Sequence, residues 1–272
     1  MIAETPPIAL TIAGSDPSGG AGIQADLKTF AALGVYGASV ITALTAQNTT
    51  GVSGVFAIPA DFIAAQYRSV VSDLTIGAIK TGMLGDVATV EIVASLLAET
   101  RAAPIVVDPV MVATSGDVLL KPDAIDAVRH ALIPRASLIT PNIPEASRLL
   151  DCPQAITVDD MRAQAESLMR FGCRAVLLKG GHGHGEDVID MLFDGKTHVP
   201  FRWSRIDTTN THGTGCTLSA AIAAGLALGQ PLAVAVADAK EFVWRALSSG
   251  SHMRVGKGNN GPIDHNFALR KL

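Results

Sequence analysis

The chain has little cysteine. Its 272 residues include only Cys152, Cys173 and Cys216, and no two of these form a Cys-x-x-Cys pair. An odd number of cysteines without that pairing argues against a disulfide framework and against a structural zinc site. We therefore expect a protein of the reducing cytoplasm.

Concentrated positive charge and long apolar runs are also absent. The formal net charge is -4 and the pI is about 5.9, and lysine and arginine form no cluster that would attract nucleic acid or an anionic membrane. No run reaches the roughly 20 apolar residues of a membrane-spanning helix, and the N-terminal residues lack the basic segment of a secretion signal. We expect a small-molecule ligand, with no nucleic acid and no membrane as partner.

The Gly-x-x-x-x-Gly-Lys-Ser/Thr motif of P-loop nucleotidases is missing too. Residues 20–25 do match the Gly-x-Gly-x-x-Ala fingerprint of dinucleotide binding. However, the second expected strand leads into Gln47 and Asn48 rather than into the acidic residue that would bind a ribose. This departure disfavours a Rossmann dehydrogenase.

Apolar residues, by contrast, are abundant. Hydrophobic residues make up 48% of the chain and the mean hydropathy is +0.34, enough for a large core, and we expect a single domain over residues 1–272. Short apolar runs alternate with helical segments, which predicts an α/β fold with a central, mostly parallel sheet and helices on both faces, a three-layer arrangement. Residues 188–203 predict a small β meander around Asp194-Gly195-Lys196.

The predicted strands are Ile8 to Ala13, Ser39 to Thr45, Ile76 to Lys80, Ile105 to Asp108, Ser137 to Thr140 and Ala175 to Lys179. The predicted helices are Ala21 to Leu33, Ala60 to Val71, Asp86 to Glu99, Asp123 to Leu132, Glu145 to Leu150, Asp159 to Phe171, Gly215 to Leu228 and Leu232 to Leu247. Polar, glycine-rich loops follow the strands. Because ligands bind outside the carboxyl ends of parallel strands, we expect these loops to converge.

The most informative loop runs from Asn210 to Ser219 and enters an apolar helix. Gly213 and Gly215 let the backbone direct several N–H groups at one point, and the helix dipole adds positive character there, so the segment predicts an anion hole. Cys216 lies in the first helical turn, where the same field would lower the pKa of a thiol. An ordinary glycine-rich helix start with a buried cysteine explains the segment equally well.

Three further side chains are candidates for phosphate and metal binding. Asn142 and Glu145 would present an amide and a carboxylate at the sheet edge, which suits Mg²⁺, although a helix cap explains them as well. Lys179 ends an apolar strand beside two glycines, and a buried cation of this kind favours an anionic partner such as phosphate. His182 and His184 are better explained by a solvated loop than by a metal site.

Together these features predict phosphoryl transfer. They are an anion hole, a cation, two side chains that could bind Mg²⁺ and a cysteine whose thiol could ionise. With these motifs the chain resembles the hydroxymethylpyrimidine/phosphomethylpyrimidine kinases of thiamine biosynthesis, in the ribokinase-like superfamily. The resemblance covers nearly the whole chain in order. The matching segments are LTIAGSDPSGGAGIQADLKTF at 10–30, TAQNT at 45–49, KTGML at 80–84, DPVM at 108–111, TPNIPE at 140–145, LKGGH at 178–182 and NTHGTGC at 210–216.

The resemblance implies a ribokinase-like fold, ATP and Mg²⁺ as cofactors, a homodimer, and a role for each matching residue. Gln47 would read the pyrimidine, since its amide offers both a donor and an acceptor. The other residues implied to line the pyrimidine pocket are Gly14, Ala21, Asp26, Met83 and Val110. Those implied to bind ATP phosphates and magnesium are Lys179, Asn142, Glu145 and Asp108. Those implied to form the anion hole are Gly213, Thr214, Gly215 and Cys216, with Cys216 as the base for the substrate hydroxyl.

Two alternatives stay open at this point. A pyridoxal kinase shares the fold and most residues on the ATP side, and its substrate also carries a hydroxymethyl group on an aromatic ring. A non-catalytic vitamer-binding protein could use the same scaffold. The presence of Cys216, Lys179, Asn142 and Glu145 argues against the second alternative, and Gln47 favours a pyrimidine over pyridoxal.

Overall fold

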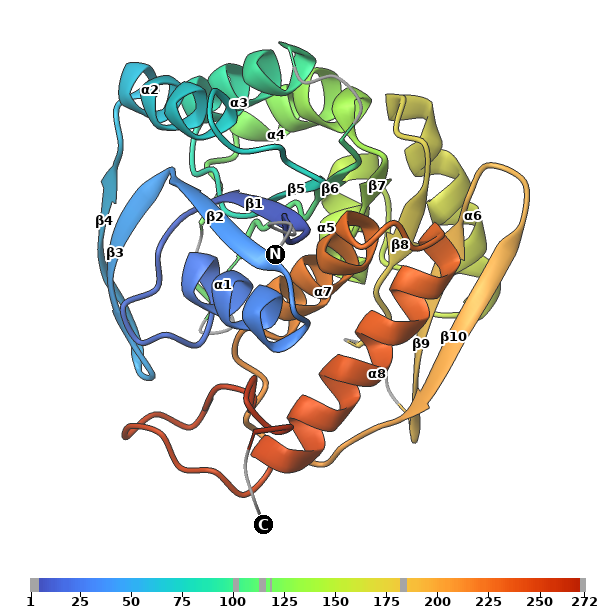
Figure 1. The fold of residues 1–272 in the computed structure, drawn as a ribbon. Helices are drawn as coiled ribbons and strands as arrows, with labels where there is room; N and C mark the ends of the chain where they lie inside the picture. The colour runs from blue at the N-terminus through green and yellow to red at the C-terminus, as the bar shows by residue number, and fades with distance from the viewer. Residues whose placement is uncertain (1–4, 100–102, 113–115, 118, 182–184, 270–272) are drawn as a thin grey trace.

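An eight-stranded sheet forms the centre of the fold in the computed structural model, which describes residues 5–99, 103–112, 116–117, 119–181 and 185–269 (Figure 1). The strand order is β10-β9-β8-β7-β6-β5-β1-β2. The strands from β8 to β2 in this order are parallel, whereas β9 and β10 are antiparallel. The strands are β1 (Ile8–Ala13), β2 (Tyr36–Ile41), β5 (Ala78–Thr81), β6 (Ile105–Val107), β7 (Leu138–Ile139), β8 (Val176–Leu178), β9 (Asp187–Phe193) and β10 (His198–Ser204).

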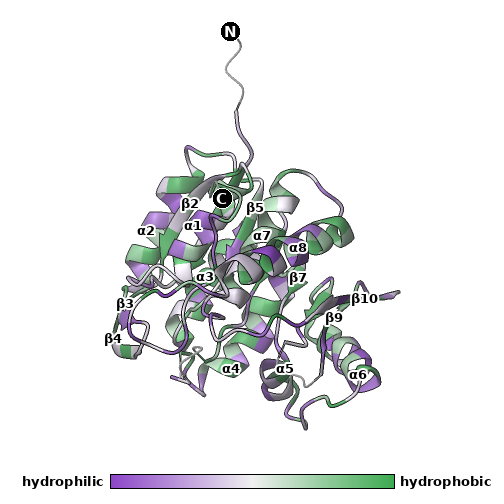
Figure 2. Cartoon of the chain, turned by 90° about the horizontal axis from the view of Figure 1, so that it is seen from below, coloured by the Kyte–Doolittle hydropathy of each residue, from purple (hydrophilic) through white to green (hydrophobic). Residues whose placement is uncertain are grey.

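Helices cover both faces of this sheet, as the sequence predicts (Figure 1). One face carries α1 (Gly22–Ala32), α7 (Thr214–Ala227) and α8 (Leu232–Gly250). The other carries α2 (Ala60–Val71), α3 (Val87–Glu99), α4 (Ala124–Ala127), α5 (Ile143–Leu150) and α6 (Val158–Leu168). Both colours of the hydropathy scale appear on α2 and α6, as expected for helices with one buried and one exposed face (Figure 2). No helix in the described ranges combines the length and apolar character that crossing a membrane requires.

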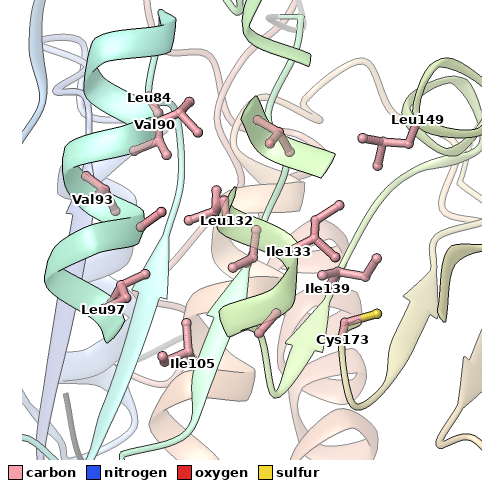
Figure 3. Close-up of a cluster of buried hydrophobic side chains, with 14 of the residues drawn as sticks. Leu84, Val90, Val93, Leu97, Ile105, Leu132, Ile133, Ile139, Leu149 and Cys173 are labelled. Atoms are coloured by element: carbon pink, nitrogen blue, oxygen red, sulfur yellow. The ribbon is translucent and has the colours of Figure 1, made fainter. Parts of the chain in front are cut away.

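The alternation of side chains along β1 divides the core into two clusters. Ala9 faces the cluster under α7 and α8, while Leu10 and Ile12 face the cluster under α2 to α6. In the second cluster, side chains from α3, from the segment after α4 and from β6, β7 and α5 point toward one another (Figure 3). Cys173 belongs to this cluster, so it is a packing residue as its apolar surroundings predict.

The predicted strand Ser39 to Thr45 is wrong, because the chain changes sheets at Thr42. Its backbone N–H donates to Ala13 O and its hydroxyl donates to Met83 O, which fixes it at the edge of the main sheet. Beyond it, β3 (Ala43–Asn48) pairs with β4 (Gly51–Ala57) in a separate antiparallel hairpin. The apolar run continues across Thr42 and so hides the break, and the two glycines in β4 conceal that strand.

The predicted helix Asp123 to Leu132 also differs from the structure. Only α4 is α-helical, and it continues as a π-helical turn over Val128–Leu132 and a 3₁₀ turn over Ile133–Arg135. Pro134 lies in this 3₁₀ turn and has no N–H with which to continue an α-helix. The other predicted helices and strands are present, with ends that shift by a few residues, and the predicted meander is the β9–β10 hairpin at the sheet edge.

Candidate active site

The loops that follow the parallel strands converge on a cavity of about 690 Å³. This position agrees with the expectation that the polar loops meet at the carboxyl edge of the sheet. The predicted site residues that line the cavity are Gly14, Ala21, Gln47, Met83, Asp108, Val110, Asn142, Glu145, Lys179, Gly213, Thr214, Gly215 and Cys216.

Gly213 shapes the turn that leads into α7. Its φ is 81°, in the left-handed region, and a Cβ on it would overlap the carbonyl oxygen of Gly20. Gly213, at the N-cap, offers no side chain to the first turn of α7, and Thr214, Gly215 and Cys216 of this turn line the cavity. The N–H of Thr214 donates to Thr211 O, whereas the following N–H groups have no capping side chain. A Cβ on Gly215 would lie 3.3 Å from the Nζ atom of Lys179, which places that ammonium beside the turn.

We expect Gly213→Ala to lower the free energy of unfolding by about 2–4 kcal/mol and to displace the anion hole, because alanine is strained at this φ and overlaps Gly20. Thermal denaturation checks this. Gly54→Ala is the control, since its new Cβ would make only an ordinary contact, 3.7 Å from the Cβ of Ala46. Equal stability of the two variants would contradict the close approach.

Lys179 and Asp108 form a buried ion pair at the centre of the cavity. The Nζ atom of Lys179 lies 2.8 Å from Oδ1 of Asp108. Asp108 also accepts hydrogen bonds from Thr140 Oγ1 at 3.0 Å and Ser219 Oγ at 3.2 Å. Although burial opposes the charge, the carboxylates of Asp108 and Glu145 hold the pKa of Lys179 above its ordinary value. The cavity therefore contains a permanently charged cation next to the turn of α7.

Asn142 and Glu145 form a capping box at the start of α5, the structural use that the sequence also allowed. Oδ1 of Asn142 accepts from the backbone of Glu145, and Oε2 of Glu145 accepts from the backbone of Asn142, both at 2.8 Å. Burial raises the pKa of Glu145 to about 7, with an opposing effect from Lys179 and a further increase from Asp108. The carboxyl is therefore about half protonated near neutrality.

The prediction of a lowered thiol pKa for Cys216 is wrong. Burial raises the pKa of Cys216 to about 11, against the favourable charge of Lys80 and a hydrogen bond from the backbone N–H of Gly22. The carboxylates of Asp26 and Asp108 oppose ionisation as well. The sequence pattern placed the residue correctly in the first turn of α7 but carried no information about desolvation or about these acids. The thiol is therefore protonated at neutral pH.

Gln47 reaches the cavity from β3, next to a bulge between Ala46 and Gln47. Thr45 Oγ1 donates to the carbonyl oxygen of Ser15 at 2.8 Å and lies 3.2 Å from Gln47 Oε1, so this hydroxyl lies next to the amide. The sulfur of Met83 packs beside Gly14, where an added Cβ would lie 3.3 Å away. Together they form a mixed polar and apolar wall.

Asp26 differs from its implied role, because it does not line the cavity. The side chain of Asp26 is fully buried beneath the cavity and accepts two hydrogen bonds from Lys80 Nζ, at 2.9 and 2.8 Å. It lies one turn into α1, whose start at Gly22 faces the cavity, so its carboxylate points back into the sheet. Lys80 itself lines the cavity.

A second pair, Asp16 and His212, was not predicted from the sequence. His212 Nε2 lies 2.8 Å from Asp16 Oδ2, and the same carboxylate accepts from the N–H groups of Ser18 and Ala21. Against the effect of burial, the hydrogen bond to His212 lowers the pKa of Asp16 to about 2. Both residues lie inside motifs that the sequence analysis quotes, but their pairing depends on the fold.

The opposite end of the cavity is aromatic and was also not predicted. Trp203 and Trp244 line it with ring centroids 5.7 Å apart. Beside them Lys240 pairs with Asp190 at 2.7 Å, and Asp190 accepts from the backbone N–H of Gly180 at 2.8 Å. An apolar end with a cation beside it suits a planar base joined to phosphates.

His182 and His184 lie outside the described residues. Within the described ranges, no group of three or more histidine, cysteine, aspartate or glutamate side chains is arranged to hold a metal ion.

The chain is similar to known kinases over nearly its whole length. The phosphomethylpyrimidine kinase family profile matches residues 16–264. A hydroxymethylpyrimidine/phosphomethylpyrimidine kinase of Rhizobium meliloti is 53% identical over 258 residues, which cover 95% of this chain and 96% of that protein. The ADP complex of Bacillus subtilis pyridoxal kinase has a TM-score of 0.88 at 38% identity, covering 97% of this chain and 99% of that one. Phosphomethylpyrimidine kinase of Clostridium difficile has a TM-score of 0.79 at 42% identity, covering 88% and 99%.

Proposed function

The chain belongs to the phosphomethylpyrimidine kinase family, and we propose that it phosphorylates 4-amino-5-hydroxymethyl-2-methylpyrimidine with ATP, first to the monophosphate and then to the diphosphate, in thiamine biosynthesis. It is a kinase with the ribokinase-like fold. The choice of substrate rests on the cavity. The amide-bearing Gln47, the turn of α7 and Lys179 all line this one space.

The two ends of the cavity suit the two substrates. The nucleotide base would pack at the aromatic end near Trp203 and Trp244, with its phosphates extending toward Lys179 and the turn of α7. The pyrimidine would lie between Gln47 and Met83, with its hydroxymethyl group near Cys216. This arrangement aligns an acceptor oxygen with the terminal phosphate, which is the main requirement of phosphoryl transfer.

In the first step the hydroxymethyl oxygen attacks the γ-phosphorus, the bond to the β-phosphate oxygen breaks, and ADP leaves. The hydroxyl proton passes to the Cys216 sulfur, which must first have lost its own proton because the thiol is protonated at rest. Lys179 and the N–H groups of α7 stabilise the charge of the transferring group. In the second step the acceptor is a phosphate oxygen that is already anionic, so no base is needed.

Measuring ADP release with the pyrimidine alcohol, its monophosphate and pyridoxal side by side tests this function. We expect turnover with both pyrimidines. Pyridoxal kinase is not favoured, because the full-length relatives near 50% identity are pyrimidine kinases and because Gln47 offers both a donor and an acceptor to an aminopyrimidine. Turnover with pyridoxal alone would reject the pyrimidine assignment, and no turnover with any of them would reject a kinase.

We expect Gln47→Leu to weaken pyrimidine binding by about 1–3 kcal/mol, because the polar edge of the ring would lose its partner in a desolvated pocket. The Michaelis constant for the pyrimidine should rise while that for ATP stays within about twofold. Gln66→Leu is the control, since that amide instead bonds the backbone of Ile41, away from the cavity. An unchanged Michaelis constant for the pyrimidine would show that Gln47 does not contact this substrate.

Magnesium fits the donor set at the centre of the cavity. Asp108 and Glu145 both line it, and the carboxylate of Asp108 contributes to the raised pKa of Glu145, a crowding of negative charge that a divalent cation would relieve. Asp108 and Glu145, with the Asn142 amide beside them, would hold the ion together with substrate phosphates. Bound there, the ion would neutralise charge on the phosphates.

The affinity for Mg²⁺ should therefore depend on pH. Protons compete with the metal for the Glu145 carboxyl, whose pKa is about 7, so the Mg²⁺ concentration for half-maximal rate should rise about tenfold per pH unit below 7 and level off above it. Titrations of Mg²⁺ between pH 5.5 and 8.5 would measure this. Glu145→Gln should bind the ion weakly with a flat profile, and an unchanged slope in that variant would exclude Glu145.

The β3–β4 hairpin supports the further proposal of a homodimer. Residues 43–57 contain no charged side chain, and Leu44, Val55 and Phe56 are exposed on the hairpin. Such an apolar surface can pair with its own copy about a twofold axis. Light scattering should show a dimer that Phe56→Glu converts to monomer. Ile156→Glu, at an apolar residue 92% exposed elsewhere on the surface, should leave the dimer intact. A cytoplasmic location stays a prediction.

A further inference from the structure

Besides Lys179 and Asp108, a second buried lysine–aspartate ion pair contributes its lysine to the lining of the cavity, and the proposed function does not use it. Lys179 and Asp108 face the phosphates, whereas the second pair joins Lys80 on β5 to Asp26 on α1. Both side chains of this second pair are completely buried. Asp26 also accepts a hydrogen bond from Thr11 Oγ1 at 2.6 Å, so the pair is fixed to the sheet on two sides.

The ammonium of Lys80 is held against the backbone at the edge of the cavity. A Cβ on Gly82 would lie 2.8 Å from its Nζ atom, so only glycine allows this approach. Although burial opposes the charge, the Asp26 carboxylate holds the pKa of Lys80 above its ordinary value. A fixed, permanent positive charge therefore lies beneath the region where the hydroxymethyl group is proposed to bind.

Cys216 and Lys80 line the same cavity, and α7, which holds Cys216, packs against β5, which holds Lys80. The charged groups that act on the Cys216 sulfur are Lys80, Asp26, Asp108 and Lys179, and the backbone N–H of Gly22 donates to it. Among the influences that favour the thiolate, Lys80 is the largest, and the nearby carboxylates oppose it. Lys80 thus acts on the one side chain that the first phosphorylation needs in its ionised form.

We propose that Lys80, held in place by Asp26, is a positioning residue of the transfer centre whose ammonium stabilises negative charge on the Cys216 sulfur. The proposal rests on the proposed function, and it predicts that the first phosphorylation depends on Lys80 while the second does not. No new bond is made by Lys80. It favours loss of the thiol proton to solvent, after which the sulfur accepts the proton of the substrate hydroxyl.

Stability alone gives little reason for this pair. Removing two charges from water costs about as much as their attraction returns, and apolar replacements of buried ion pairs are often neutral or stabilising. Lys80 and Asp26 are both buried to 0% exposure, so both charges carry this cost in full. A role in charge stabilisation explains why an ion pair occupies this position.

Two measurements on Lys80→Met test the proposal. The first is the rate of alkylation of Cys216 by iodoacetamide at pH 8, read from its peptide by mass spectrometry with Cys152 in the same sample as internal reference. The second is the kcat of each phosphorylation step. We expect alkylation of Cys216 and the first step to slow together by at least about tenfold, which is one pKa unit, while the second step changes by less than about threefold.

The double variant Lys80→Met/Asp26→Asn keeps the test valid if the single variant does not fold. Because it removes the opposing carboxylate together with the ammonium, its alkylation rate should fall between those of Lys80→Met and the wild type. Lys240→Met is the matched control, because it breaks a different buried ion pair, with Asp190, and should not separate the two steps.

Equal loss of both steps in the Lys80 variants, or an unchanged alkylation rate of Cys216, would overturn the proposal and leave Lys80 a structural residue. Failure of the wild type to phosphorylate the pyrimidine alcohol would instead reject the proposed function. The alkylation rates would then still decide whether Lys80 acts on Cys216, because they require no substrate.

Discussion

Cys216→Ser should lower kcat for the pyrimidine alcohol by about 10²–10⁴-fold, the usual contribution of a positioned base, with little change in Tm. Serine is nearly isosteric with cysteine, but its hydroxyl ionises far less readily than a thiol. The second phosphorylation should be affected less, because its acceptor is already an anion. Steady-state assays on the two substrates provide the comparison.

The pH dependence of the wild type adds a second readout to this prediction. Because the pKa of Cys216 is about 11, the thiolate fraction rises about tenfold per pH unit below that value, and kcat of the first step should rise with pH between 7 and 9. Cys216→Ser should lack this rise. A flat profile in the wild type, or equal losses on both substrates, would leave Cys216 only a member of the anion hole.

Cys173→Ser is the matched control for Cys216→Ser. Cys173 lies in the core cluster of Figure 3, and burial raises the pKa of its thiol to about 11 as well. Its replacement places a hydroxyl among apolar side chains and should lower Tm without lowering kcat. The two cysteines thus separate a catalytic effect from a packing effect at similar thiol pKa.

Lys179→Met should lower the rates of both phosphorylation steps by about 10²–10³-fold, because both transfer the same γ-phosphoryl group past the same cation. The loss should also be larger at high pH than at low pH. Without the ammonium, the acidic side chains of Asp108 and Glu145 repel the phosphates. Because Lys179 holds down the pKa of Glu145, that pKa should lie above its wild-type value of about 7 in the variant, and the repulsion should grow as the pH rises through it. The rates of both steps at pH 6 and pH 9 would measure this.

Lys196→Met serves as the control for Lys179→Met. Lys196 is exposed in the turn between β9 and β10, so loss of its charge should leave both rates unchanged. A Lys179→Met variant that lost only one of the two steps would place its ammonium at the acceptor rather than at the transferred phosphoryl group.

Much of the fold follows from local patterns in the sequence. Runs such as Ile8 to Ala13 are apolar except for Thr11, as expected for a strand buried on both faces, and glycine and polar residues mark where such runs end. The rule that ligands bind at the carboxyl ends of parallel strands then brings Asp108, Asn142 and Lys179 together without any knowledge of their contacts.

The features that the sequence did not predict depend on contacts between distant residues. Asp26 turns away from the cavity because Lys80, 54 residues later, offers it an ammonium in the core. The pKa of Cys216 is set by burial and by the charges of Lys80, Asp26 and Asp108, none of which is visible in its own segment. The β3–β4 hairpin was missed because an exposed strand with glycines lacks the apolar pattern that identifies a buried one.

The contact between Gly213 and Gly20, together with the pairing of His212 with Asp16, joins segments that are 196 residues apart in sequence. Closing so long a loop is entropically costly until the intervening strands have ordered the chain. The turn of α7 can therefore take its place against Gly20 only when α1 and α7 pack on their shared face of the sheet. A nascent chain that ends before residue 210 contains the residues proposed to bind the pyrimidine but lacks the turn proposed to bind the transferring phosphoryl group.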